Sequence, residues 1–124
     1  EVEVGRERVM FALAAAMLVE RVTYFVMKNT LKRLRPYDVK ANFSSLIKAS
    51  DKFSFPSGHT SAAFCFSTIT IVIFGGVFAA MLVWAALVGA SRVIIGVHFP
   101  GDIAAGAILG SGIAIGTAST LSLW

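Results

Sequence analysis

The chain has 124 residues, of which 56% are hydrophobic, and its mean hydropathy is +0.78. Soluble domains are about 45–50% apolar, so this composition is typical of a membrane protein, and the length allows one compact domain at most. The net charge is +4. Because the basic residues cluster at the ends of apolar segments, where phospholipid headgroups or anionic substrates lie, nucleic acid is not expected as a partner.

A first long helix is predicted over residues 9–34. Pro36 disfavours helical geometry at the residue before it and lacks an amide donor, so it marks the end. The helix would be roughly 39 Å long, enough to cross the hydrocarbon. Glu20 and Arg21 interrupt its apolar surface. Since adjacent helical residues do not face each other, each is expected to need a partner on another helix or in a wet cavity.

Residues 37–55 form the long connecting segment. Four of its residues recur at three-to-four-residue spacing, which predicts a short amphipathic helix lying on the membrane surface. They are Phe43, Leu46, Ile47 and Ser50.

Three further long helices follow. The second begins near Ser57, which has N-cap chemistry, and ends at residue 74 before a Gly75-Gly76 reversal. The third runs back to about Arg92, and the fourth begins near Asp102 and extends to about residue 123. Close packing of the fourth helix is expected at its glycines, because they let backbones approach. These are Gly106, Gly110, Gly112 and Gly116.

The predicted fold is therefore an all-α transmembrane bundle of about four long helices plus a short interfacial helix, in a single domain over residues 1–124. Successive helices alternate in direction. The end of the first, the start of the second, the end of the third and the start of the fourth are consequently expected on one membrane face. The Gly75-Gly76 turn and both termini are expected on the other face.

A basic block closes the first helix. Lys28, Lys32 and Arg35 stand at i, i+4 and i+7, a spacing that places three cations along one helical stripe, where they can hold a phosphate. A juxtamembrane cluster that touches lipid headgroups is the alternative interpretation.

Pro56-Ser57-Gly58-His59 leads directly into the second helix. The free amides of a helix N-terminus point at an anion and the helix dipole favours negative charge there. His59 in this first turn can protonate a leaving alkoxide near neutral pH. A capping or packing histidine is the alternative.

The third block contains Ser91-Arg92, His98 and Asp102. Arg92 offers a fork of donors to an oxyanion, and a carboxylate can orient an imidazole that acts as a nucleophile. A zinc site built from two histidines and a carboxylate is the rival interpretation. Converging cations would repel a divalent metal, so no metal is expected.

Taken together, Lys28 to Pro36, Pro56 to His59 and Ser91 to Asp102 resemble the three-part signature of the type-2 phosphatidic acid phosphatase superfamily: K-x6-R-P, P-S-G-H and S-R-x5-H-x3-D. Every motif position matches. The resemblance implies metal-independent hydrolysis of phosphomonoesters or pyrophosphates by a membrane-embedded lipid phosphatase, through a phosphohistidine intermediate and without a cofactor.

The resemblance also implies the role of each residue. His98 would be the nucleophile, Asp102 its partner and His59 the general acid. Five further positions would hold the phosphoryl oxygens: Lys28, Arg35, Arg92, Ser57 and the amide of Gly58. Membrane members commonly have about six spanning helices, so two N-terminal helices usual in the family are expected to be missing from these 124 residues.

The expected substrate is a lipid phosphate such as phosphatidic acid, phosphatidylglycerol phosphate or a polyprenyl pyrophosphate, with membrane lipids as surroundings. A non-catalytic phospholipid-binding or transport module is the alternative function. The resemblance places the protein in a bacterial inner membrane with its site on the periplasmic or outer face, although the positive-inside rule points the basic face inward. Neither the physiological lipid nor the oligomeric state follows from the sequence.

Overall fold

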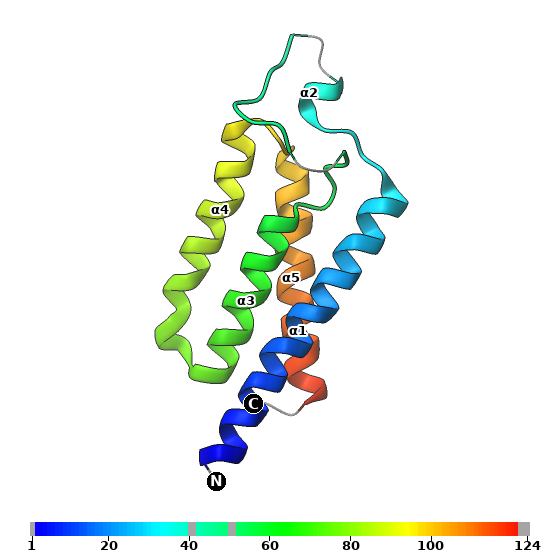
Figure 1. Ribbon diagram of the computed structural model, residues 1–124. Coiled ribbons are helices and arrows are strands. Elements are labelled where there is room, and N and C mark those ends of the chain that lie inside the picture. Colours follow the sequence, from blue (N-terminus) through cyan, green and yellow to red (C-terminus); the bar gives the residue numbers. More distant parts are fainter. Residues whose placement is uncertain (1, 40–41, 50–51, 122–124) are drawn as a thin grey trace.

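The protein is built from helices. A computed structural model describes residues 2–39, 42–49 and 52–121, with side chains from residue 5 onward. These ranges contain no strand, only an isolated antiparallel bridge between Leu34 and Phe53. The predicted all-α bundle is confirmed. Its helices are α1 (Val2–Leu31), α2 (Pro36–Val39), α3 (Gly58–Phe74), the 3₁₀ helix η1 (Gly76–Ala80), α4 (Met81–Ile95) and α5 (Pro100–Thr120), as Figure 1 shows.

Local signals in the sequence account for most helix ends. The Ser57 side chain accepts a hydrogen bond from the Thr60 amide and so caps α3. Gly75 and Gly96 end α3 and α4 with φ values of 103° and 96°, a region that glycine adopts without strain. Helix α5 begins with Pro100, and the Asp102 side chain accepts a bond from the Phe99 amide at 2.8 Å.

Helix α3 lies at the centre of the bundle and packs against α1, α4 and α5. Its contact with α5 is close because glycines of α5 face the α3 backbone. A Cβ at Gly106 would lie 2.8 Å from the Ser57 carbonyl oxygen, and one at Gly110 would overlap the Ser61 carbonyl oxygen. The predicted close packing is thus confirmed for these two. It is wrong for Gly112 and Gly116, where a Cβ would meet nothing within 4 Å.

The outer surfaces of the helices are apolar. Three helical segments in the described part of the chain are long and apolar enough to cross a membrane: Gly5–Leu31, Gly76–Ile95 and Pro100–Thr120. Helix α3 is apolar but shorter. Large apolar side chains such as Leu18, Val83 and Ile108 are more than half exposed, as expected where hydrocarbon replaces water. The composition and these helices define an integral membrane protein.

The first helix ends earlier than predicted. Helix α1 stops at Leu31, and Lys32 adopts a positive φ of 51°. Beyond it the chain pairs with residues far along the sequence: the Ser54 amide donates to the Arg33 carbonyl at 2.7 Å. This pairing replaces the last helical turn that Pro36 alone would have allowed. The predicted helical stripe of Lys28, Lys32 and Arg35 is therefore wrong, because only Lys28 belongs to α1.

The predicted amphipathic helix at residues 43–50 is also wrong where it can be tested. Residues 42–49 are not helical, and Ser50 lies outside the described residues. The Leu46 amide donates to the carbonyl of Ile95 at the end of α4, so it is not free for a helical bond. A short helix does occur in this connection, but it is α2, which begins at Pro36.

The predicted arrangement of the helix ends is confirmed. In Figure 1 the end of α1, the start of α3, the end of α4 and the start of α5 lie at the upper end of the bundle, beside the connection that carries α2. The turn at η1 lies at the other end, together with the start of α1 and the end of α5, while the terminal residues 1 and 122–124 lie outside the described residues. The three motifs therefore meet at one end of the molecule.

Candidate active site

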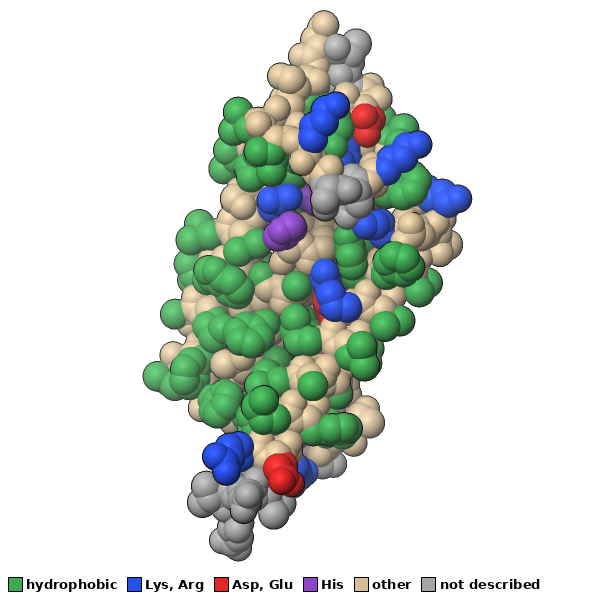
Figure 2. Space-filling model, in the orientation of Figure 1, with side chains coloured by type: hydrophobic (Ala, Val, Ile, Leu, Met, Phe, Trp, Pro, Cys, Tyr) green, Lys and Arg blue, Asp and Glu red, His purple; other side chains and the backbone are tan. Residues whose placement is uncertain are grey.

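A cavity of about 260 Å³ opens at this end. It collects side chains from α1, α3, α4 and the connections between them, and most of these side chains are basic or carry a histidine ring. They are Arg21, Tyr24, Lys28, Arg35, Ala49, Gly58, His59, Arg92 and His98. Figure 2 shows blue and purple side chains gathered in the upper part of the visible face, above a largely green surface. The cavity is thus built for an anion at the edge of an apolar body.

His98 is held from both sides. Its Nδ1 lies 3.3 Å from Oδ2 of Asp102, four residues later in the first turn of α5. Its Nε2 lies 3.3 Å from Nη1 of Arg35. A carboxylate only accepts and a guanidinium only donates, so this pattern fits a ring that carries its proton on Nδ1 and its lone pair on Nε2. In this tautomer the Nε2 lone pair accepts from Arg35, and the His98 side chain also lines the cavity.

Asp102 is completely buried, and each of its contacts comes from a positively polarised group. Oδ2 accepts from the Phe99 amide at 2.8 Å in addition to facing His98. Oδ1 lies 3.4 Å from Nη1 of Arg33, whose guanidinium stacks 4.4 Å from the centre of the Phe99 ring. The carboxylate is therefore fixed in position, which suits it to orient His98.

Three motif cations reach the cavity from different elements. Arg35 is almost fully buried and donates from Nη1 to the Val97 carbonyl at 2.8 Å. Lys28 donates to the Tyr24 hydroxyl at 3.2 Å and is also buried. Arg92, in the last turn of α4, is half-buried. Burial and these contacts restrict the side chains, so they can bind phosphoryl oxygens with little loss of conformational freedom.

The start of α3 brings Gly58 and His59 to the cavity, but Ser57 does not line it. The Ser57 hydroxyl donates to Thr60 Oγ1 at 2.8 Å, and its amide donates to the Asp102 carbonyl at 3.1 Å. These bonds tie α3 to the first turn of α5. His59 is exposed, next to Gly58, where a Cβ would lie 2.7 Å from the Tyr24 ring. Gly58 is thus required for the close approach of α1.

Arg21 and Tyr24 also line the cavity, and the three motifs do not contain them. A signal for them exists in the sequence: Arg21, Tyr24 and Lys28 stand at i, i+3 and i+7 and so share one face of α1. The prediction that Glu20 and Arg21 cannot pair is wrong. Arg21 donates from Nε and Nη2 to the Glu20 carboxylate at 2.5 and 2.6 Å, because its long side chain lies back along the helix. Arg21 does have the expected partner on another helix, the Gly58 carbonyl at 2.8 Å.

The described residues contain no group of three or more His, Cys, Asp or Glu side chains that could hold a metal ion. The zinc interpretation would need His59, His98 and Asp102 together. Asp102 is instead engaged with His98, Phe99 and Arg33. Metal-free chemistry stays a prediction.

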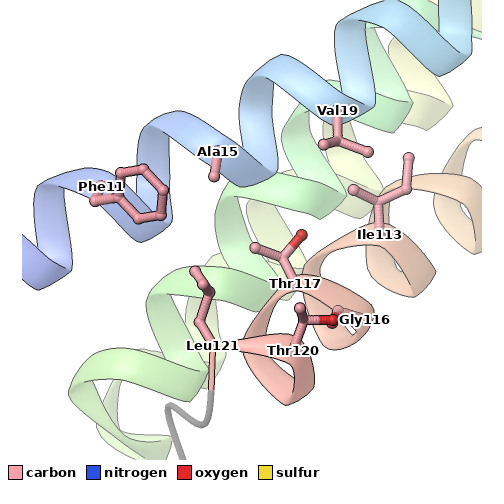
Figure 3. A pocket seen from close by; sticks show the side chains of 8 residues that line it. All are labelled: Phe11, Ala15, Val19, Ile113, Gly116, Thr117, Thr120 and Leu121. Atoms are coloured by element: carbon pink, nitrogen blue, oxygen red, sulfur yellow. The ribbon is translucent and has the colours of Figure 1, made fainter.

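A larger cavity, of about 470 Å³, lies between α1 and α5 toward the opposite end of the bundle. Figure 3 shows its lining, which has no titratable side chain: Phe11, Ala15, Val19, Ile113, Gly116, Thr117, Thr120 and Leu121. Nothing in it can bind a phosphate strongly or transfer a proton. The smaller, basic cavity is therefore the candidate active site.

The described chain is thus an integral membrane helix bundle with a basic cavity at one end and a buried His98–Asp102 pair beside it. The sequence model of the PAP2 superfamily matches residues 9–123. The chain belongs to this superfamily, which is the family that the three motifs predicted.

Known relatives agree with this membership. The chain is 33% identical over 106 residues to the bacitracin transport permease protein BcrC of Bacillus licheniformis, covering 86% of this chain and 52% of that protein. It is 34% identical over 108 residues to phosphatidylglycerophosphatase B of Bacillus subtilis, covering 73% of this chain and 47% of that protein. The chain thus spans about half the length of the curated relatives it matches.

Two solved structures resemble the fold. A transmembrane PAP2-type phosphatidylglycerolphosphate phosphatase from Bacillus subtilis superposes with a TM-score of 0.77 and 26% identity, over 96% of this chain and 65% of that one. LpxE of Aquifex aeolicus superposes with a TM-score of 0.79 and 29% identity, over 92% and 69% of the two chains. The helix bundle is therefore one that membrane proteins of this superfamily use.

Proposed function

We propose that this chain carries the active site of an integral membrane phosphatase that hydrolyses a lipid phosphate monoester or pyrophosphate. The observation that supports it most is the cavity itself. Residues from all three motifs, far apart in the sequence, line one hollow at one end of the bundle. Phosphoryl transfer needs chiefly positioning and neutralisation of spreading negative charge, which a ring of fixed cations supplies.

The contacts of these residues support a two-step mechanism. Nε2 of His98 attacks phosphorus, the P–O bond to the leaving group breaks, and its electron pair stays on the leaving oxygen, which takes a proton from His59. Asp102 stabilises the cationic ring that carries the phosphoryl group. Water then attacks phosphorus with His59 as base, the P–N bond breaks, and phosphate leaves while His98 recovers its lone pair. Lys28, Arg35 and Arg92 bind the phosphoryl oxygens, with the Gly58 amide at the N-terminus of α3; Ser57 supports this cradle as the cap of the helix.

The candidate substrates are phosphatidic acid, phosphatidylglycerol phosphate and polyprenyl pyrophosphate. The names of two relatives favour the second of these, since both are phosphatases of phosphatidylglycerol phosphate. A site at the end of the bundle lets the tails of such a lipid stay in hydrocarbon while the headgroup reaches the cations.

A non-catalytic phospholipid-binding or transport module is the second candidate, because one relative bears the name of a transport permease. Trapping the intermediate separates the two. Purified protein is incubated with a ³²P-labelled phosphate ester, quenched, and tested for label that is stable to base and labile to acid. The phosphatase is expected to trap label, and His98→Ala is expected to lose it at unchanged thermal stability. A wild-type chain that never acquires label while it retains the lipid would favour the binding module.

The proposal places the protein in a bacterial inner membrane with the cavity on the periplasmic or outer face. The positive-inside rule favours the opposite orientation, since the cavity end is the more basic. Several of those cations, however, line the cavity and have a catalytic reason to be there. They therefore carry less weight as topology signals than cations without such a role.

A further inference from the structure

Arg21 lines the active-site cavity from a position farther down α1 than Lys28. It precedes Lys28 by seven residues on α1, so it lies about 10 Å farther from the membrane-surface end of that helix. Both side chains line the same cavity. The cavity thus extends from cations near the surface to a guanidinium at the level of the hydrocarbon, where an unpaired charge is costly.

The contacts of Arg21 fix the position of its side chain. The Glu20 carboxylate binds its Nε and Nη2 as a fork, and Nη2 also donates to the Gly58 carbonyl. The guanidinium stacks 4.6 Å from the centre of the Tyr24 ring. Glu20 is fully buried, so the carboxylate holds Arg21 from behind without facing the cavity. The Arg21 side chain is 45% exposed, and its Nη1 makes no hydrogen bond to any described residue.

The position of Arg21 relative to His98 and His59 indicates whether it lies on the nucleophile side or on the leaving-group side of a bound substrate. Arg35 lies beside Nε2 of His98, the proposed nucleophile, whereas Arg21 lies on the carbonyl of Gly58, next to His59, the proposed acid. In-line displacement puts the leaving group opposite the nucleophile. Arg21 is therefore on the leaving-group side.

The depth of Arg21 in the membrane independently places it on the leaving-group side. The leaving group of a lipid phosphate carries the apolar tail, which lies in hydrocarbon, and Arg21 is on the hydrocarbon side of Lys28. An apolar groove of about 440 Å³ adjoins the cavity here and shares Arg21 and Tyr24 with it. Arg21 thus stands where the polar cavity meets an apolar surface.

We propose that Arg21 is a substrate-binding residue that contacts the group between the scissile phosphate and the tail, and that it favours lipid diphosphates over monoesters. This rests on the proposed function. In a diphosphate that group is a second phosphate. When the His98 Nε2–P bond forms and the bridging P–O bond breaks, the electron pair goes to the bridging oxygen, and the leaving group is a phosphate monoester whose charge Arg21 neutralises. A simple monoester such as farnesyl phosphate offers Arg21 only an alkoxide oxygen, and in phosphatidylglycerol phosphate the second phosphate lies a glycerol unit farther away.

The first experiment compares farnesyl diphosphate with farnesyl phosphate, which share one tail. Arg21→Gln is expected to lower kcat/KM for the diphosphate by about 100-fold and for the monophosphate by no more than about 5-fold. Arg21→Lys, which keeps the charge but not the fork, is expected to lie between. Lys32→Gln is the matched control, because Lys32 is an exposed cation just beyond α1 that does not line the cavity. An equal loss on both substrates, or no loss, would overturn the proposal.

The second experiment does not need turnover. Binding of methylenediphosphonate and of methylphosphonate to the purified chain in detergent is measured by calorimetry, with the wild type expected to prefer the diphosphonate and Arg21→Gln to lose that preference. If this holds while no ester is hydrolysed, the phosphatase proposal fails and the subsite stands. If esters are hydrolysed but the preference is unchanged in the variant, the subsite fails alone. Where Arg21→Gln does not fold, Arg21→Lys decides both experiments.

Discussion

Asp102 combines a structural and a chemical task in one carboxylate. The same oxygen, Oδ2, accepts from the Phe99 amide and faces Nδ1 of His98, while Oδ1 faces Arg33. The N-terminus of α5 and the orientation of the imidazole are therefore set by one side chain. This explains why a carboxylate four residues after the histidine is useful at a helix start, where its charge also complements the dipole.

Asp102→Asn is expected to lower kcat roughly 100-fold or more, since the charge that stabilises the phosphorylated ring is lost. The amide cannot satisfy all neighbours either. If the Asn oxygen points toward Phe99 and His98, the Asn NH₂ group faces the guanidinium of Arg33. If the amide is flipped, the NH₂ group faces the N–H groups of Phe99 and His98. Turnover of a phosphate ester measures the effect. Asp38→Asn, an exposed carboxylate on α2, is the matched control and should keep wild-type turnover.

Chelation is expected to leave turnover unchanged, because the cavity presents basic groups that repel a divalent ion and neutralise the phosphoryl oxygens themselves. The protein is assayed before and after prolonged dialysis against EDTA. A zinc-dependent phosphatase in the same buffer verifies that the chelator removes metal. Loss of activity that added zinc restores would contradict metal-free hydrolysis.

At the scale of the helices, sequence patterns predicted the long helices. They did not predict the hydrogen bonds that the segment between α1 and α3 makes with distant residues. Ser57, Gly75 and Asp102 act locally, so their capping signals are legible in the sequence. The end of α1 was misplaced because it depends on pairing of Arg33 with Ser54, a contact between residues far apart in the chain. The amphipathic spacing at residues 43–50 failed for the same reason, since the Leu46 amide bonds the end of α4.

The α3–α5 contact makes a prediction that separates two glycines on one helix. Gly110→Ala is expected to destabilise the protein by about 1 to 3 kcal/mol, because the new Cβ would overlap the Ser61 carbonyl oxygen and lie 2.8 Å from the Cys65 amide nitrogen, and backbone cannot move aside cheaply. Gly112→Ala is the matched control. Its Cβ meets nothing within 4 Å, so helix propensity predicts a gain of up to about 1 kcal/mol. Thermal unfolding in detergent measures both; equal shifts would contradict the packing argument.

For the whole molecule, the decisive inference was that successive helices alternate in direction. Alternation alone brought Lys28, His59, Arg92 and His98 to one end, as the structure shows. Arg21 was predicted to need a partner on another helix or a wet cavity, but it was not linked to the three motifs, because an arginine within an apolar segment was treated as an interruption of the helix surface. Its role depends on the Glu20 fork and the Gly58 carbonyl, and neither contact has a periodic signal in the sequence.

The orientation of the whole chain in the membrane can be tested by cysteine labelling. Cys65 is the one cysteine of the sequence and is fully buried, so a Cys65→Ala background gives a silent starting point. Lys48→Cys marks the cavity end, where Lys48 is exposed, and Val77→Cys marks the opposite end, where Val77 is 84% exposed. With the cavity on the outer face, a membrane-impermeant maleimide should label position 48 in intact cells and position 77 only after permeabilisation. The reverse pattern would place the cavity in the cytoplasm, and the basic residues at that end would then follow the positive-inside rule in addition to lining the site.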